Sequence, residues 1–156
     1  KKKKIVFLGN GGSYYDASHI AAEFTTGLYH DKNSCTYIDV VVPASGEMTA
    51  LVNDEGIDSM FAHCIQRRED VGLVIGYSTS GNARNVLEAF KRAKEKKIGT
   101  VGFTGGDGGL FKKEGVCDCL LVVPDNNTAR IQEAHKAISH IIVGIVYQKM
   151  GNKCDV

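Results

Sequence analysis

The chain has 156 residues, a length that fits one domain, so a single domain over residues 1–156 is expected. Its 19 basic and 18 acidic residues give a net charge of +1, which argues against a nucleic-acid surface and against a membrane-binding face. No apolar run approaches the roughly 20 residues that span a bilayer, and the composition predicts a soluble, cytoplasmic protein.

Five short apolar runs predict β-strands over residues 5–8, 37–42, 71–77, 98–103 and 119–123. Longer segments between them predict helices over about 16–26, 56–67, 83–96, 110–114 and 128–150. On the last helix an apolar stripe, of the kind that faces a core, is formed by Ala134, Ile138, Ile141 and Ile145. Apolar strands that alternate with helices indicate an α/β fold with a parallel sheet covered on both faces. Ligands bind such folds beyond the carboxyl ends of the strands, where glycine and hydroxyl residues concentrate here.

The first of these loops is Gly9-Asn10-Gly11-Gly12-Ser13, which leads into a helix. Glycines allow a ligand to approach the backbone closely, and a helix N-terminus favours an anion. A dinucleotide-binding motif is excluded because its third glycine would fall at Tyr14, and no Gly-Lys-Ser/Thr follows as in a P-loop. No nucleotide cofactor is therefore expected, and the loop is either a ligand loop or a structural turn.

The second loop, Ser78-Thr79-Ser80-Gly81-Asn82, follows a buried strand and precedes a helix. Three consecutive hydroxyls and the N–H groups of a helix start form a phosphate cradle that needs no lysine. Capping of the helix by Ser80 or Asn82 is the simpler alternative, but a cap needs one such residue, not four. The third loop, residues 104–109, is glycine-rich and is either a flexible turn or part of the site.

Two helices carry side chains of the types that hold metal ions. His19 and Glu23 lie four residues apart and project from one face, whereas Gln132 and His140 lie eight residues apart on the last helix, roughly 80° around it. Two imidazoles and a carboxylate suit zinc, with the Gln132 amide oxygen as a poorer fourth ligand. On spacing alone, a surface ion pair and a packing histidine are the alternatives.

Together these segments resemble the sugar isomerase (SIS) domain family, and more narrowly its phosphoheptose isomerase branch. The resemblance rests on motifs that occur in order over nearly the whole chain: Gly9-Asn10-Gly11-Gly12-Ser13, His19-x-x-x-Glu23, Asn53-Asp54, Ser78-Thr79-Ser80-Gly81-Asn82, and Arg130-Ile131-Gln132-Glu133 followed by His140. It implies a three-layer sandwich with a five-stranded parallel sheet of flavodoxin-like or Rossmann-like topology. It also implies a homotetramer with active sites at subunit interfaces. Ala83 and Ala129 depart from the pattern, at positions where heptose enzymes carry a hydroxyl and an aspartate.

The resemblance further implies a reaction and the residues that perform it. The reaction is conversion of sedoheptulose 7-phosphate to D-glycero-D-manno-heptose 7-phosphate through an enediol-type intermediate, the first step towards the ADP- or GDP-heptose of lipopolysaccharide and related glycans. Glu23 and His140 would be the acid/base pair, beside one zinc ion per subunit. The implied metal ligands are His19, Glu23, Gln132 and His140. The implied substrate contacts are Asn10, Gly11, Gly12, Ser13, Glu23, Asn53, Asp54, Ser78, Thr79, Ser80, Asn82 and Gln132.

Two other functions stay open on the sequence. One is an isomerase for another sugar phosphate, which the hydroxyl-rich loop alone would permit. The other is a non-catalytic SIS-domain binding protein that docks a replication-initiation partner. The complete set of Glu23, Gln132 and His140 favours an enzyme, because a scaffold does not need these side chains.

Overall fold

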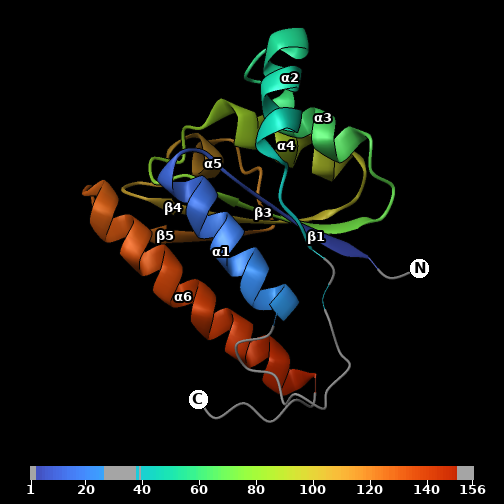
Figure 1. Ribbon diagram of the computed structural model, residues 1–156. Helices are drawn as coiled ribbons and strands as arrows, with labels where there is room; N and C mark the ends of the chain where they lie inside the picture. The colour runs from blue at the N-terminus through green and yellow to red at the C-terminus, as the bar shows by residue number, and fades with distance from the viewer. Residues whose placement is uncertain (1–2, 27–37, 39, 151–156) are drawn as a thin grey trace.

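A computed structural model describes residues 3–26, 38 and 40–150, and shows a parallel sheet between two layers of helices (Figure 1). The strands are β1 (Lys4–Gly9), β2 (Val40–Val41), β3 (Val71–Tyr77), β4 (Gly99–Gly105) and β5 (Cys119–Val123). The helices are α1 (Gly12–Thr26), α2 (Ser45–Glu55), α3 (Met60–Gln66), α4 (Arg84–Glu95), α5 (Gly109–Lys113) and α6 (Thr128–Lys149). The five strands pair in parallel in the order β2-β1-β3-β4-β5, which is the flavodoxin-like order. The predicted α/β three-layer sandwich is confirmed.

Each face of the sheet has its own apolar core. On one face α1 and α6 bury Phe24 and Tyr147 against Phe7 of β1 and Phe103 of β4. On the other face α3, α4 and α5 cover the sheet, and Phe90 of α4 belongs to a second cluster with residues of β1 and β3. Because both faces are covered, the strands are mostly apolar, and β4 buries the polar side chains of Thr100 and Thr104 as well. No helix in the described part of the chain is long and apolar enough to cross a membrane.

Several predicted boundaries differ from the structure. The first helix begins at Gly12, four residues earlier than predicted, because the glycine loop itself opens the helix. The helix predicted over 56–67 is confined to Met60–Gln66. The strand predicted over 37–42 is seen only as Val40–Val41, and residues 37 and 39 lie outside the described residues.

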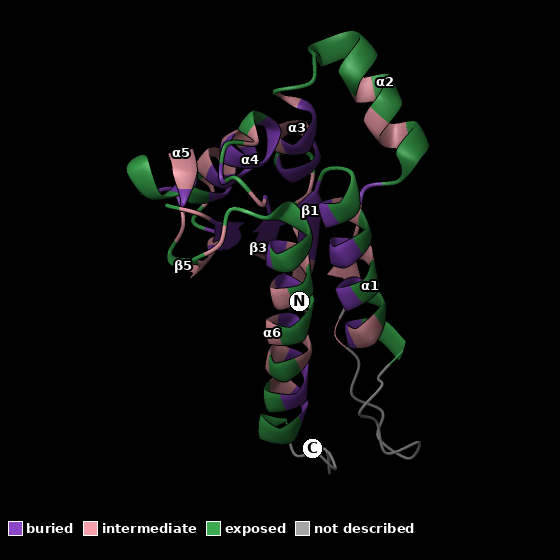
Figure 2. Ribbon diagram, turned by 90° about the vertical axis from the view of Figure 1, so that its left-hand side faces the viewer, coloured by how far each residue is buried: buried purple, intermediate pink, exposed green. Residues whose placement is uncertain are grey.

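Helix α2 was not predicted at all. None of its residues is fully buried, and it projects from the body of the molecule (Figure 2). Its apolar stripe is limited to Met48, Leu51 and Val52, which is too short to predict a helix by periodicity. On α6 the predicted stripe is wrong at two positions, since Ile141 and Ile145 are 61% and 47% exposed. The buried face of α6 contains His135 and Ser139 instead, which hydrogen-bond to β4 and β3 through the His135 Nε2 and the Ser139 hydroxyl. The His135 Nδ1 has no hydrogen-bond partner among the described residues.

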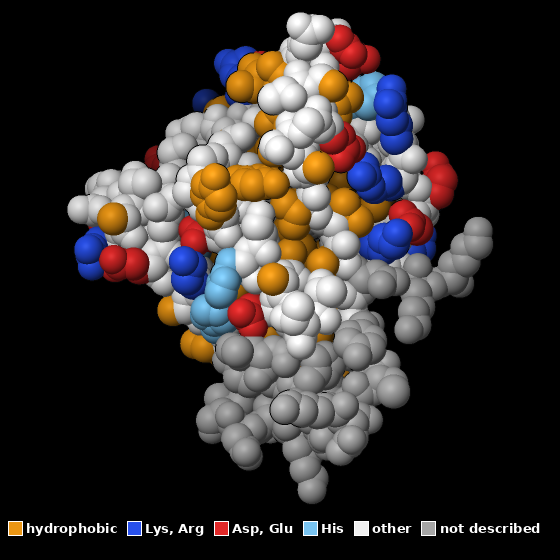
Figure 3. Space-filling view, in the orientation of Figure 1, with side chains coloured by type: hydrophobic (Ala, Val, Ile, Leu, Met, Phe, Trp, Pro, Cys, Tyr) orange, Lys and Arg blue, Asp and Glu red, His pale blue; other side chains and the backbone are white. Residues whose placement is uncertain are grey.

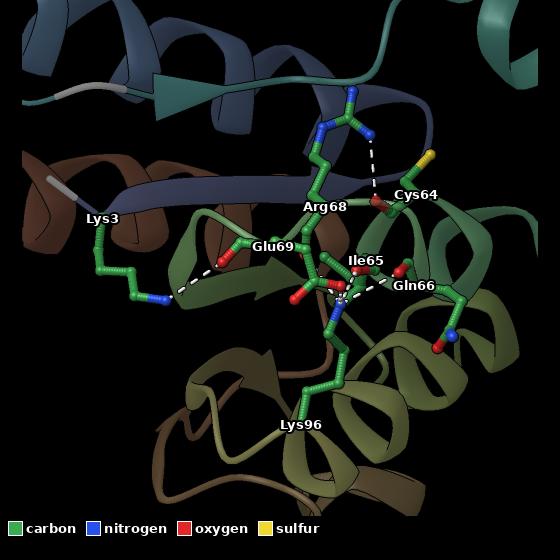
Figure 4. Close-up of polar contacts among 7 residues, drawn as sticks. All are labelled: Lys3, Cys64, Ile65, Gln66, Arg68, Glu69 and Lys96. Atoms are coloured by element: carbon green, nitrogen blue, oxygen red, sulfur yellow. Dashed lines mark hydrogen bonds and ion pairs between the residues drawn. The ribbon is translucent and has the colours of Figure 1, made fainter. Parts of the chain in front are cut away.

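Lys96, directly after α4, stabilises the end of α3 (Figure 4). Its Nζ donates to the carbonyl oxygens of Ile65, Gln66 and Arg68 at 3.2, 3.0 and 2.8 Å, and the side chain is only 20% exposed. The last carbonyls of a helix lack partners within the helix, so the ammonium replaces bonds that the backbone cannot make.

We expect Lys96→Met to lower the free energy of unfolding by about 2 kcal/mol, because three carbonyls lose a charged donor. Urea denaturation measures the change. Lys113→Met, at an exposed position on α5, is the control and should stay within about 0.5 kcal/mol of the wild type. Equal stability of the two variants would contradict the capping role of Lys96.

Candidate active site

The loops after β1 and β3 meet at one edge of the sheet. Gly9 pairs with Tyr77 in the register of these neighbouring strands, so the glycine loop (residues 9–13) and the hydroxyl loop (residues 78–82) leave the sheet side by side. This is the point at which the strand order reverses, where open α/β sheets bind ligands. A cavity of about 280 Å³ opens there, and it is lined by Asn10, Ser13, Tyr77, Ser78, Thr79, Ser80, Asn82 and Ala83. The structure therefore brings together the two loops that the sequence analysis selected.

The hydroxyl loop is not a helix cap. Helix α4 begins after Ala83, which has no side-chain capping bond, whereas Ser80 Oγ accepts from the Asn82 backbone N–H at 3.2 Å. Asn82 Oδ1 accepts from the N–H of Leu110 on α5 at 3.0 Å. The simple capping alternative is therefore wrong, and the hydroxyls of this loop line a cavity at the start of α4, where an anion is favoured.

The third loop, residues 104–109, packs against the hydroxyl loop and supports it. The N–H of Phe111 donates to the Gly81 carbonyl at 3.1 Å, and both Gly81 and Gly109 adopt positive φ angles of 66° and 54°. A second cavity, of about 430 Å³, lies between the two loops and the start of α6. The third loop is thus part of the framework of the site and not merely a flexible turn.

Asn85 is a functional candidate that the sequence analysis missed. Its Nδ2 donates to Asn10 Oδ1 at 2.8 Å, and Asn10 Nδ2 donates to Asn85 Oδ1 at 2.9 Å. Asn85 is only 5% exposed, and it also accepts from the N–H of Val86 in the first turn of α4. This reciprocal amide pair fixes the orientation of the Asn10 side chain and ties the glycine loop to the helix that follows the hydroxyl loop.

Helices α1 and α6 carry the cluster with the donors of a metal site. His19 Nε2 lies 3.0 Å from His140 Nε2 and 3.6 Å from Glu23 Oε1, and ligand atoms of all three residues lie within 4.8 Å of one another. Histidine side chains lie beside an acidic one on this face of the molecule (Figure 3). His19 is 44% exposed and Glu23 only 13%, so a ligand can enter while the carboxylate stays shielded. Two imidazole nitrogens and one carboxylate are donors that zinc takes in catalytic sites.

Gln132 is not beside this cluster. Its amide packs against Gly12, where a Cβ atom would collide with Nε2. Since Gln132 and His140 are eight residues apart on one helix, their backbones are separated by about 12 Å along its axis.

Asn53 and Asp54 are also placed away from the two loops. They bond to each other on α2 at 2.9 Å, and Asp54 lines a separate cavity with Glu47, His63 and Cys64. Within one chain the structure therefore brings the hydroxyl loop and the glycine loop together, and forms the His19–Glu23–His140 cluster further along α1. It does not bring Gln132 to that cluster, or Asn53 and Asp54 to the two loops.

A buried polar cluster lies beneath the site, and the sequence did not indicate it. His135 is fully buried, and its Nε2 lies 3.1 Å from the Thr104 carbonyl oxygen, so Nε2 carries the proton. Burial lowers the pKa of His135, and a neutral ring follows. The hydroxyls of Tyr77 and Ser139 lie 2.9 Å apart, and burial raises the pKa of Tyr77 well above its usual value. These bonds join α6 to the ends of β3 and β4.

Known proteins share this sequence and this fold. The family model described as SIS domain matches residues 1–105. A phosphoheptose isomerase from Burkholderia pseudomallei is 40% identical over 151 residues, which cover 96% of this chain and 75% of that protein. One from Clostridium acetobutylicum is 42% identical over 155 residues, 98% of this chain and 78% of that protein. The solved phosphoheptose isomerase structure from Neisseria gonorrhoeae aligns with a TM-score of 0.80 and 36% identity, over 94% of this chain and 77% of that one.

A flavodoxin-like sheet with a hydroxyl loop where the strand order reverses defines, together with the matching family model, a SIS-domain protein. The identity to curated relatives extends over nearly the whole chain and includes the segments that carry the two loops and the His19–Glu23–His140 cluster. The chain therefore belongs to the phosphoheptose isomerase family and is an isomerase. The resemblance found in the sequence is confirmed, and a non-catalytic binding protein is not favoured.

Proposed function

We propose that this enzyme converts sedoheptulose 7-phosphate into D-glycero-D-manno-heptose 7-phosphate, at the start of heptose biosynthesis. The observation that carries the proposal is that one chain unites a hydroxyl loop for the phosphate with a shielded carboxylate flanked by two imidazoles. Phosphate contacts are assigned to Ser78, Thr79, Ser80 and Asn82, and sugar contacts to Asn10, Gly11, Gly12, Ser13 and Gln132. A charged sugar phosphate does not cross a lipid bilayer unaided, so the reaction belongs in the cytoplasm.

The chemistry requires a proton to move between two neighbouring carbons. Glu23 takes the proton from C1 of the ketose, and the electron pair of that bond forms the C1–C2 double bond of an enediol. His140 gives a proton to the C2 oxygen and receives one from the C1 oxygen as the aldehyde forms. Return of the carbon-bound proton to C2 completes the aldose, with no net gain or loss of atoms. Glu23 suits this role because it is shielded from water and lies in contact with His19.

The cluster also fits a zinc ion, one per subunit, with His19, Glu23 and His140 as ligands. Bound zinc would polarise the oxygens of the reacting carbons. For Gln132 to be the fourth ligand, its amide must move away from Gly12, or the Gln132 of a second copy of the chain must supply the ligand.

We expect His19→Ala to lower zinc affinity by at least about a hundredfold, because one of three ligands is lost. Titration calorimetry with zinc chloride measures this loss. His63→Ala on α3, a histidine outside the cluster, is the matched control and should bind zinc as the wild type does. Unchanged zinc binding in the His19 variant would contradict the metal site.

A homotetramer with sites at subunit interfaces agrees with two features of the surface. Large apolar side chains are exposed at Tyr15, Ile57, Ile141 and Ile145. Helix α2 has no buried residue and carries Asn53 and Asp54 away from the loops of its own chain, so these residues can serve the site of a neighbouring copy. Light scattering after size-exclusion chromatography tests the assembly, and a monomer would contradict it. We further propose that residues 1–156 form one SIS domain.

The reaction itself is tested by proton NMR of the purified protein with sedoheptulose 7-phosphate in deuterated water, with and without added zinc. New aldose anomeric signals, with deuterium incorporated at C2, are the expected result. If the ligand binds but the spectrum does not change, this substrate is wrong and another sugar phosphate takes its place.

We expect Asn85→Asp to raise KM for the sugar phosphate about tenfold, because a carboxylate cannot donate to Asn10 and the glycine loop loses its fixed amide. Steady-state kinetics measure the change. Thr100→Val removes another buried hydrogen-bonding side chain, 3.0 Å from Asp118, and serves as the control for stability. A similar KM change in both variants would assign Asn85 a purely structural role.

A further inference from the structure

Helices α1 and α6 lie side by side and run in the same direction (Figures 1 and 2). Three contacts mark successive levels along the seam between them. At the first level Gly12 meets Gln132, at the second Asp16 meets Lys136, and at the third His19 meets His140. The first level adjoins the cavity of the hydroxyl loop, which Ser13 lines, and the third holds the catalytic carboxylate Glu23.

A substrate that is held at both ends must pass the middle level. From Ser13 to His19 the rise of α1 is about 9 Å at 1.5 Å per residue. An extended chain advances about 1.2 Å per bond, so the eight bonds from the phosphorus to C1 of a heptose 7-phosphate span about 10 Å. With the phosphate at the hydroxyl loop and C1 at Glu23, the middle carbons of the sugar lie beside Asp16 and Lys136.

The middle level offers a cation suited to hydroxyl groups. Lys136 Nζ lies 3.2 Å from Asp16 Oδ1 and its side chain is 49% exposed, so the ammonium keeps further N–H donors towards solvent. Lys136 also follows Gln132 and precedes His140 by four residues each, which places all three on adjoining parts of one helix face.

The Asp16–Lys136 pair is poorly arranged for stability alone. Asp16 is 5% exposed, and its Oδ2 has no hydrogen-bond partner in the part of the chain that the structure describes. Burial of a carboxylate oxygen without a partner costs free energy, and one half-exposed lysine does not offset the desolvation of the whole group. Buried groups that are left in this state occur preferentially at functional sites.

We propose that Lys136 is a substrate-contacting residue that donates to the middle hydroxyls of the sugar, and that Asp16 is the positioning residue that holds its ammonium. This subsite makes the seam selective for a sugar phosphate long enough to span all three levels. The inference rests on the proposed function, because it requires a phosphorylated sugar bound between the hydroxyl loop and Glu23.

The test compares Lys136→Met with Lys91→Met. Lys91 on α4 is 40% exposed and pairs with Glu88 and Glu114 at 2.9 and 3.0 Å, so its replacement removes a similarly exposed, paired lysine far from the seam. Calorimetry with sedoheptulose 7-phosphate should show an affinity about tenfold weaker for Lys136→Met and unchanged for Lys91→Met. Affinity for inorganic phosphate should be unchanged in both variants, because the hydroxyl loop is intact. Lys136→Arg, which keeps the charge and the donors, should recover most of the loss.

Asp16→Asn provides a second readout, since it should weaken sugar-phosphate binding while Lys136 is still present. The proposal is overturned if Lys136→Met binds the sugar phosphate as Lys91→Met does, or if it loses inorganic phosphate to the same extent. Turnover of the wild type is measured separately. A wild type that binds sedoheptulose 7-phosphate without converting it would refute the proposed reaction, and the affinities would still decide the role of Lys136.

Discussion

We expect replacement of Glu23 with Gln to abolish isomerisation, with kcat for sedoheptulose 7-phosphate reduced at least about a thousandfold. The amide keeps the shape of the side chain but cannot accept the proton from C1. Glu23 is only 13% exposed, so solvent does not readily substitute for it. The measurement is proton NMR in deuterated water, in which the variant should show neither aldose signals nor deuterium at C2.

The matched control for this variant is Glu88→Gln, because Glu88 is a helical glutamate paired with a lysine on α4, away from the seam. Both variants should unfold at the wild-type temperature within about 2 °C, since each change keeps the size and shape of the side chain. A Glu23→Gln enzyme that retains turnover would remove Glu23 from the proton transfer, whatever its effect on zinc.

The strands and the sheet were predictable because they are buried on both faces. Continuous apolar runs such as Val71–Tyr77 identify parallel strands directly. The glycines and hydroxyl residues that follow them indicate the carboxyl ends of the strands, where ligands bind. Helix α2 has a weaker signal, since only Met48 and Leu51 pack against the core and neither is fully buried. On α6 apolar residues occur on several sides, so periodicity selected Ile141 and Ile145 although tertiary hydrogen bonds bury His135 and Ser139.

The site residues that lie within one sequence motif could be predicted from the sequence. Those that act through a residue from a distant segment could not. His19 and Glu23 are visible as a helical pair, and the hydroxyl loop stands out by its composition. Asn85, by contrast, acts by hydrogen-bonding to Asn10, which lies 75 positions away in the sequence. No local sequence pattern predicts such a bond. Lys136 gains its position from the parallel packing of α1 and α6, which places it against Asp16. The same packing puts Gln132 against Gly12, a placement that spacing along α6 could not reveal.

Among single substitutions in the loops that follow β1, β3 and β4, Gly81→Ala should cause the largest loss of stability and of phosphate affinity. Gly81 has a φ of 66°, and a Cβ atom there would collide with the Gly108 carbonyl and with Thr104 Oγ1. The hydroxyl loop and the third loop would have to separate, breaking the bond from the Phe111 N–H to the Gly81 carbonyl. We expect a loss of at least about 3 kcal/mol in unfolding free energy, and inorganic phosphate affinity lowered at least about tenfold.

Gly115→Ala separates the two causes of that loss. Gly115 has a similar φ of 57°, but no described residue beyond its chain neighbours has an atom within 4 Å of the added Cβ, so only the conformational penalty of about 1 kcal/mol remains. Denaturant unfolding and phosphate calorimetry on both variants therefore isolate the collision between the loops. If Gly81→Ala lost stability but kept its phosphate affinity, the third loop would support the fold without shaping the phosphate site. If both quantities fell together while Gly115→Ala kept its affinity, the close packing of these two loops would be what positions the hydroxyls for the phosphate.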